Sequence, residues 1–313
     1  MLDACLTPEL AAELTLQPVR RYGVDTAIFY SDIMVPLKLA GINVDIVRGR
    51  GPVFESPVRS AGDVARLVDH RVNDWSPITE AVSLVTGELD SHTSLLGFAG
   101  APFTLASYII EGAPSKDHMA ARAFMQAQPE AWDALANWCA DLSGAFLRAQ
   151  VDAGACGVQL FDSWAGSLHP HTYEHSVLPY STRALSHVTD APRIHFAVGA
   201  SHLLELMARP ASAIGVDWRI DLGEAARRVP NKPLQGNLDP AVLFLPEAEL
   251  LAAVDAVLEA GKAAPAHIFN LGHGVPPNAD VAKLQLVVDY VHDYATSATT
   301  TDTVGTTSTQ EEE

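Results

Sequence analysis

The stretch Ala27-Ile28-Phe29-Tyr30-Ser31-Asp32-Ile33-Met34-Val35-Pro36 sets our interpretation of the whole chain. Its first part is an apolar run of β-preferring residues after a turn-like Tyr22-Gly23-Val24-Asp25, and this pattern predicts a buried strand. Asp32 follows where that run ends. Since α/β folds bind ligands at the carboxyl ends of their strands, Asp32 is a candidate functional carboxylate. The alternative is that Asp32 caps a helix beginning at Ile33, which the nearby Pro36 would suit.

The same strand pattern recurs along the chain. Six further apolar segments predict strands, namely Ser94–Phe98, Cys156–Phe161, Arg193–Val198, Ala213–Asp217, Pro233–Gly236 and His267–Leu271. Helical patterns lie between them, namely Thr7 to Tyr22 with a bend at Pro18, Ala61–Arg71, Ile78–Leu89, a helix with the apolar stripe Trp132, Leu135, Cys139, Leu142 and Phe146, Ala200–Ala208, Leu222–Arg228, Glu247–Ala260 and Ala279–Tyr294. This alternation predicts a parallel sheet with helices outside it.

The fold class expected from this pattern is an α/β, (β/α)8 TIM-type barrel. Such a barrel has eight strands, each followed by a helix, whereas the first element predicted here is the helix after Thr7. Either the sheet is open or the first strand is missing from this chain, and we favour the second interpretation. Residues 1–295 would form this single domain, with irregular structure in the glycine-rich residues 41–60. Residues 296–313, rich in Thr, Ser and acids, predict a disordered tail.

The composition narrows the function classes. The 313 residues are 48% hydrophobic, which is enough for a large core. No apolar run reaches the roughly 18 residues of a membrane span and no signal sequence is evident, so we expect a soluble cytoplasmic protein. The net charge of −18 argues against nucleic acid and anionic membranes as partners. Cys5, Cys139 and Cys156 are too scattered for a disulfide frame, and Cys139 is expected to serve packing.

Three more polar residues join Asp32 as candidates for chemistry. Ser163 and His273 follow predicted strands, and Tyr108 lies in the helix after Gly100-Ala101-Pro102, near the same face. Each also has a plain structural explanation: Ser163 as a cap, Tyr108 as a core aromatic and His273 as part of a tight turn. Glycines on both sides of His273 would let a ligand approach the backbone closely. If all four side chains lie at the carboxyl ends of the strands and face one opening of the barrel, a binding site is favoured over four separate structural roles.

Two other types of site are weaker interpretations. A Ser-His-Asp hydrolase triad is not favoured because Ser163 lacks the Gly-x-Ser-x-Gly turn. His169, His171 and His175 are close in sequence, but no acid or cysteine completes a recognisable metal-ligand spacing, so we expect no metal.

With these residues in view, the chain resembles the uroporphyrinogen decarboxylase family over about residues 1 to 294. The resemblance rests on five motifs in the right order: Phe29-Tyr30-Ser31-Asp32, Gly97-Phe98-Ala99-Gly100-Ala101-Pro102-Phe103-Thr104 with Tyr108, Leu160-Phe161-Asp162-Ser163-Trp164-Ala165-Gly166, Gln235-Gly236-Asn237-Leu238-Asp239-Pro240 and Phe269-Asn270-Leu271-Gly272-His273-Gly274. It implies a (β/α)8 barrel, usually a homodimer, that removes four acetate carboxyls from uroporphyrinogen III without a cofactor and yields coproporphyrinogen III.

The chemistry of that reaction explains the residue types. An acetate on a pyrrole loses CO2 only when the ring is protonated first and can accept the electrons left behind. An ionised Asp32 would accept hydrogen bonds from the pyrrole N–H groups and stabilise the cationic intermediate. Tyr108, Ser163 and His273 resemble the substrate-contacting positions of the family. The resemblance thus implies Asp32 as the catalytic residue and all four as substrate-binding residues.

The chain departs from the family at its start. The family begins with a segment near Pro-Val-Trp-Phe-Met-Arg-Gln-Ala-Gly-Arg, which carries the first strand and substrate-binding arginines, and nothing here matches it. Our hypothesis is that Met1 is a misassigned start. The chain as written would then lack its main anion-binding arginines and be impaired. Arg48 and Arg50 are candidates to hold acidic side chains, although simple solvation explains them equally well.

Two competing functions remain open. One is a barrel that binds porphyrinogens without turning them over. The other is a zinc-dependent methyltransferase acting on a corrinoid or thiol carrier, a class with the same architecture and a His-x-Cys pair near a middle strand. The corresponding stretch here is His195-Phe196-Ala197, with alanine in place of the cysteine, so the zinc site is not expected.

Overall fold

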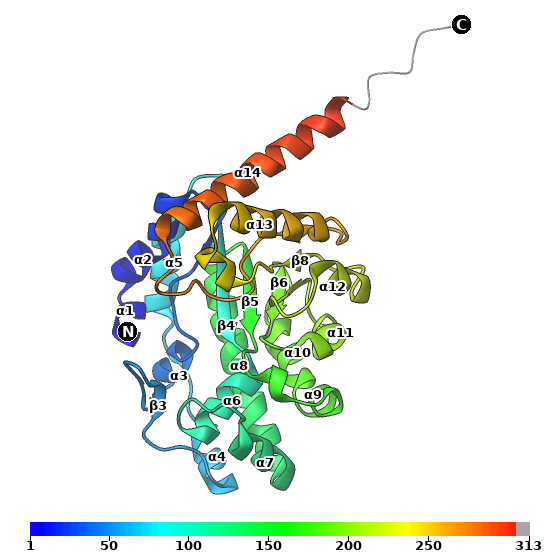
Figure 1. Cartoon of the computed structure of the whole chain (residues 1–313). Coiled ribbons are helices and arrows are strands. Elements are labelled where there is room, and N and C mark those ends of the chain that lie inside the picture. The colour runs from blue at the N-terminus through cyan, green and yellow to red at the C-terminus, as the bar shows by residue number, and fades with distance from the viewer. Residues whose placement is uncertain (305–313) are drawn as a thin grey trace, which may run out of the picture.

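The computed structural model describes residues 1–304, without the side chains of 296–304 (Figure 1). Its main sheet has seven strands, all paired in parallel. In spatial order they are β1 (Thr26–Ile28), β4 (Ser94–Gly100), β5 (Gly157–Phe161), β6 (Arg193–Phe196), β7 (Ala213–Gly215), β8 (Leu234–Gln235) and β9 (His267–Ile268). Every strand lies within or overlaps a segment predicted from the sequence, and the parallel α/β class is confirmed.

The sheet is curled. Gln159 of β5 and Gln235 of β8 are separated by two strands, yet Gln235 Nε2 donates to Gln159 Oε1 at 3.3 Å. In a flat sheet three strand spacings would hold these side chains roughly 14 Å apart. The two amides therefore meet across the concave interior, as expected for a barrel. The sequence prediction of a TIM-type barrel architecture is confirmed, with seven strands in the described residues.

The interior is open between β1 and β9. Within residues 1–304, β1 pairs only with β4 and β9 only with β8. Ile28 and Ile268 share the interior face with their partners Leu96 and Gln235, but they are 44% and 46% exposed while the partners are 8% and 6% exposed. The difference arises because no described strand covers the outer edge of β1 or β9.

Helices surround the sheet. The α-helices are α1 (Leu2–Cys5), α2 (Pro8–Tyr22), α3 (Val35–Leu39), α4 (Ala61–Leu67), α5 (Ser76–Glu88), α6 (Pro102–Glu111), α7 (Met119–Ala127), α8 (Pro129–Asp152), α9 (Pro170–Ser176), α10 (Leu178–Ser186), α11 (Leu204–Met207), α12 (Leu222–Arg228), α13 (Glu247–Gly261) and α14 (Val281–Val304). Short 3-10 turns are η1 (Ala165–Ser167), η2 (Ser201–Leu203) and η3 (Pro240–Phe244). None of the helices within the described residues has the length and apolarity needed to cross a bilayer.

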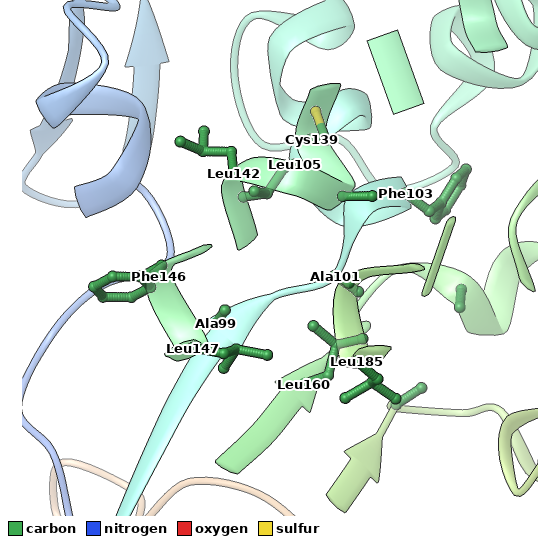
Figure 2. Close-up of a cluster of buried hydrophobic side chains, with 14 of the residues drawn as sticks. Ala99, Ala101, Phe103, Leu105, Cys139, Leu142, Phe146, Leu147, Leu160 and Leu185 are labelled. Carbon is green, nitrogen blue, oxygen red and sulfur yellow. The ribbon is translucent and has the colours of Figure 1, made fainter. Parts of the chain in front are cut away.

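One part of the main core fills the layer between the sheet and α6, α8 and α10 (Figure 2). Leu160 of β5 faces the side chains of Leu147 and Leu185 there, and all three are fully buried. The predicted stripe of α8 is confirmed, since all five of its members are buried. Burial raises the pKa of the Cys139 thiol, as expected for a cysteine that serves packing.

Two local predictions need correction. The glycine-rich segment expected to be irregular contains an antiparallel hairpin of β2 (Val44–Val47) and β3 (Gly51–Phe54). Gly49 and Gly51 adopt φ of 76° and 83°, so glycines allow the reversal between the strands. The last helix, α14, continues past residue 295, where the tail was expected to begin, and runs out beyond the body of the molecule (Figure 1). The rest of the predicted tail, 305–313, lies outside the described residues.

Truncating the core should destabilise the fold in proportion to burial. Leu147 is 0% exposed, and Leu147→Ala should lower the free energy of unfolding by ~3 kcal/mol because the packed layer closes a cavity only partly. Leu84→Ala is the matched control, since Leu84 is 39% exposed and its loss should cost much less. Urea unfolding followed by far-UV circular dichroism measures both changes. Equal midpoint shifts for the two variants would contradict this description of the core.

Candidate active site

Asp32 lies in the loop that joins β1 to α3. Its Oδ1 accepts a hydrogen bond from the Met34 N–H at 2.8 Å, directly before α3 begins. The capping alternative is thus partly right, although Met34 holds the N-cap position itself. Among the described residues, no donor reaches the second oxygen of Asp32, so the carboxylate keeps accepting capacity for a ligand.

The surroundings of Asp32 disfavour its charge. Burial raises the pKa of the Asp32 carboxyl above its usual value, and the Met34 N–H and the amino group of Met1 offset this only in part. The group is half-buried rather than sealed, so it can still meet a ligand. A partly dehydrated carboxylate with one open oxygen gains most from a positive partner.

Tyr108 is the second predicted residue, on α6 after β4. Burial, with a smaller contribution from the charge of Asp32, raises the pKa of the Tyr108 hydroxyl to about 12. The phenol is therefore a neutral hydrogen-bond donor at physiological pH. The charge of Asp32 acts on the Tyr108 hydroxyl, whereas a shared binding site for the two residues stays a prediction.

Ser163 belongs to a loop tied to the same helix. Thr104 of α6 donates from Oγ1 to Oδ1 of the buried Asp162 at 3.0 Å and accepts from the Trp164 N–H at 3.4 Å. The Trp164 ring lies 3.8 Å from the Tyr108 ring, measured between centroids. Ser163 is half-buried and its side chain makes no hydrogen bond within residues 1–304. Both chain neighbours of Ser163 are thus held by α6, and the Ser163 hydroxyl is left available.

His273 lies in a different part of the rim. It is exposed, and its ring meets the Trp218 ring edge-on, with centroids 5.9 Å apart. Gly272 allows this close passage, because a Cβ there would lie 2.5 Å from the Trp218 backbone nitrogen. No contact joins His273 to Asp32, Tyr108 or Ser163 in the described residues, so the convergence of all four residues stays a prediction.

A groove borders the His273 side of the rim. It has a volume of about 320 Å³ and lies between α12 and α13, with Trp218, Arg219 and Asn237 in its wall. Neither this groove nor a small cavity of about 10 Å³ near Asp217 is lined by any of the four predicted residues. The binding site predicted around Asp32 therefore also stays a prediction.

Sequence reasoning missed a cation on this rim. The Arg219 guanidinium lies 3.8 Å from the Trp218 ring centroid, and its Nη1 donates to Oδ2 of the buried Asp217 at 2.6 Å. The strand-end sequence Asp217-Trp218-Arg219 is a pattern that would have drawn attention to it. Arg48 and Arg50, which were candidates, lie exposed in the turn of the β2–β3 hairpin and have no ion-pair partner in the described chain.

The histidines considered for metal have structural roles. His169 Nδ1 accepts from the His171 N–H at the start of α9, and the His171 and His175 rings stack 4.2 Å apart. His195 of β6 is fully buried, 3.9 Å from Asp162 Oδ2. In the part of the chain that the structure describes, no group of three or more His, Cys, Asp or Glu residues is placed to hold a metal ion.

The amino-acid sequence is similar to those of known proteins. Residues 1–294 match the family described as Uroporphyrinogen decarboxylase (URO-D). The chain belongs to the uroporphyrinogen decarboxylase family. It is 56% identical over 296 residues to the uroporphyrinogen decarboxylase of Arthrobacter sp. (strain FB24), covering 93% of this chain and 86% of that protein. Identity to the enzyme of the same name from Leifsonia xyli subsp. xyli is 54% over 317 residues, covering 93% and 84%.

Solved structures agree on the fold. A methyltransferase from Methanosarcina mazei superposes with a TM-score of 0.78 at 17% sequence identity, covering 94% of this chain and 87% of that one. A B12-independent methionine synthase from Shewanella sp. W3-18-1 gives a TM-score of 0.59 at 12% identity, covering 92% and 88%. At these identities the likeness concerns the fold alone.

The raised pKa of Asp32 predicts an unusual effect of removing its charge. Because the folded chain holds this proton more tightly than the unfolded chain, the wild type loses stability as pH rises from the unfolded pKa through the folded one. Asparagine does not titrate and still accepts from the Met34 N–H. Asp32→Asn should therefore raise Tm at pH 7, and the gain should vanish below about pH 4. Far-UV circular dichroism melts at both pH values measure this.

Asp63→Asn is the control of opposite sign. The Arg59 N–H and the Ser60 hydroxyl and N–H hold the pKa of Asp63 below its usual value, so its charge stabilises the fold at pH 7. That variant should melt lower than the wild type at pH 7. A lower Tm for Asp32→Asn at pH 7 as well would show that the charge of Asp32 does not destabilise the folded protein.

Proposed function

We propose that this chain decarboxylates the four acetate side chains of uroporphyrinogen III and yields coproporphyrinogen III, in tetrapyrrole and haem biosynthesis. Membership of the family and relatives more than 50% identical support the reaction. The single observation that supports assigning the reaction to this site is Asp32, a half-buried carboxylate after β1 with one oxygen that accepts no hydrogen bond.

The electrostatics of Asp32 suit a reaction that passes through a cation. Protonation of a pyrrole ring carbon makes the ring an electron sink. The bond between the acetate carboxylate and its methylene then breaks, CO2 leaves, and its bonding electrons pass into the ring system. The methylene carbon takes up a proton, the ring carbon releases the proton it had gained, and the neutral pyrrole is restored. Asp32 accepts from the pyrrole N–H groups, which carry positive charge only after ring protonation. Because burial disfavours the lone charge of Asp32, the carboxylate interacts more strongly with the cation than with the neutral substrate. Such a difference lowers the barrier rather than merely tightening binding.

The other predicted residues would hold the acidic side chains. The Tyr108 phenol stays protonated, with a pKa of about 12, and so donates to a substrate carboxylate. The Ser163 hydroxyl has no internal partner and can donate in the same way. His273 reaches the substrate from the Trp218 side of the rim. No cofactor enters this mechanism because the pyrrole ring itself accepts the electrons.

Two alternative functions remain, and a measurement of CO2 release from uroporphyrinogen III distinguishes them from this proposal. A barrel that only binds porphyrinogens would retain the substrate and release no CO2. A zinc methyltransferase is less favoured, because Ala197 stands where that class would need a cysteine ligand. We further propose a cytoplasmic location, which the three free cysteines support because they are typical of a reducing compartment.

Removal of the Asp32 charge should abolish turnover. Asp32→Asn keeps the hydrogen bond from Met34 but cannot stabilise a cation, so kcat should fall by about 10³-fold. The measurement is coproporphyrinogen formed from uroporphyrinogen III under reducing conditions. Asp45→Asn is the control, because Asp45 lies in the β2–β3 hairpin with a side chain 82% exposed, and it should keep the wild-type rate. Near-normal turnover by Asp32→Asn would refute this role.

We also propose that the chain works as a homodimer, as the resemblance implies. Several apolar side chains are exposed in segments near the start of α14: Phe244, Leu245, Val275 and Val281. Lys283 Nζ donates to the Leu245 carbonyl, so α14 is joined to the residue that follows η3. Sedimentation equilibrium should give about twice the chain mass of 33.4 kDa. Phe244→Glu should shift the protein toward monomer, and a monomeric wild type would contradict the proposal.

A further inference from the structure

His118 is a residue whose conformation its own helix does not explain. It precedes α7 with φ of 50°, and it is the one residue other than glycine with positive φ within residues 1–304. Side chains with a Cβ disfavour this left-handed region, and asparagine or glycine would meet the backbone demand more easily. The His118 side chain does not cap α7. A strained backbone at such a place indicates that the imidazole itself is required elsewhere.

The imidazole is buried against the Trp164 ring. Its centroid lies 4.2 Å from that ring at an interplanar angle of 35°, and the Tyr108 centroid lies 3.8 Å from it at 33°. Two rings stacked this closely on one face would overlap, so His118 and Tyr108 lie on opposite faces of Trp164. His118 is 4% exposed, whereas Tyr108 and Trp164 are half-buried toward the rim.

Hydrogen bonds fix the orientation of the His118 ring. The Ser167 hydroxyl donates its only proton to the Trp164 carbonyl at 2.9 Å. His118 Nδ1, 3.2 Å from the same Ser167 Oγ, must therefore be the donor in that contact. Nε2 is then an acceptor, and it is buried without a partner among the described residues. The unpaired Nε2 costs free energy, and the stacking of the imidazole on the Trp164 ring offsets that cost.

We propose that His118 is a positioning residue for the decarboxylation. It packs against the face of the Trp164 ring opposite Tyr108, and so fixes the Tyr108 hydroxyl where it meets the substrate. This inference rests on the proposed function of the site. It goes beyond the five family motifs, none of which contains His118. Three contacts connect His118 to Tyr108 through Trp164. His118 packs on one face of the Trp164 ring, Thr104 accepts from the Trp164 N–H, and Tyr108 stacks on the opposite face of the ring.

A double-mutant cycle tests this coupling. His118→Gly suits the left-handed backbone and removes the ring, while Tyr108→Phe keeps the stack and removes the hydroxyl. In the wild-type background His118→Gly should lower kcat/KM for uroporphyrinogen by about tenfold, because a misplaced donor loses its geometry. In the Tyr108→Phe background it should lower kcat/KM less than twofold. Equal losses in both backgrounds would overturn the proposal, even if Tm falls.

A spectroscopic readout decides the question without turnover. The near-UV circular dichroism of Trp164, obtained by subtracting the spectrum of Trp164→Phe, should weaken in His118→Gly. His202→Ala is the control: His202 is an exposed histidine whose Nε2 lies 2.8 Å from the Leu168 carbonyl, and its loss should leave the Trp164 spectrum unchanged. An unchanged Trp164 spectrum in His118→Gly would also overturn the proposal.

The failure of the proposed function has a different signature. If the wild type releases no CO2, the decarboxylase proposal fails, and the same four-variant cycle is then measured as the affinity for uroporphyrin I, the stable oxidised octacarboxylate. A non-additive loss of affinity supports the positioning role of His118. Additive losses, or no uroporphyrin binding by the wild type, overturn it.

Discussion

The parallel pairing of β1, β4 and β5 is the constraint on which the candidate site depends. Ile28 pairs with Leu96, and Leu96 with Gly157, so the carboxyl ends of these strands lie side by side. The residues that follow each strand consequently emerge at one edge of the sheet. Asp32, Tyr108 and Trp164 come from these three connections, and the Tyr108 and Trp164 rings are neighbours for that reason. The apolar layer under α6 and α8 keeps the strands rigid enough to present them (Figure 2).

Opposing free-energy contributions meet at this edge. Stacked aromatic rings and the Thr104 hydrogen bonds stabilise it, whereas the half-buried charge of Asp32 and the left-handed backbone of His118 destabilise it. Local costs of this kind are typical of functional sites, where they prepare groups for a ligand that is not yet bound. The cost at Asp32 has a clear purpose in the proposed mechanism, because a developing cation would relieve it.

Much of this architecture was predictable because its signals are local. Apolar runs of four to six residues marked all seven strands, and the stripe on α8 marked its buried face. The β2–β3 hairpin was missed because glycines that permit a tight reversal also occur in irregular loops. The extension of α14 to Val304 was missed because Thr and Ser are weak helix formers. Neither error touched the site, since both elements lie outside the main sheet.

By itself, the sequence determined the α/β class, the strand-end positions of Asp32 and Ser163, the place of Tyr108 after β4, and the family, because each depends on residues close together in the chain. Only the tertiary structure decided which side chains meet. Trp164 lies between Tyr108 and His118, and Trp218 meets His273; both contacts join residues that no periodicity connects. Such contacts depend on how the curled sheet and its helices pack, and packing is a property of the whole chain.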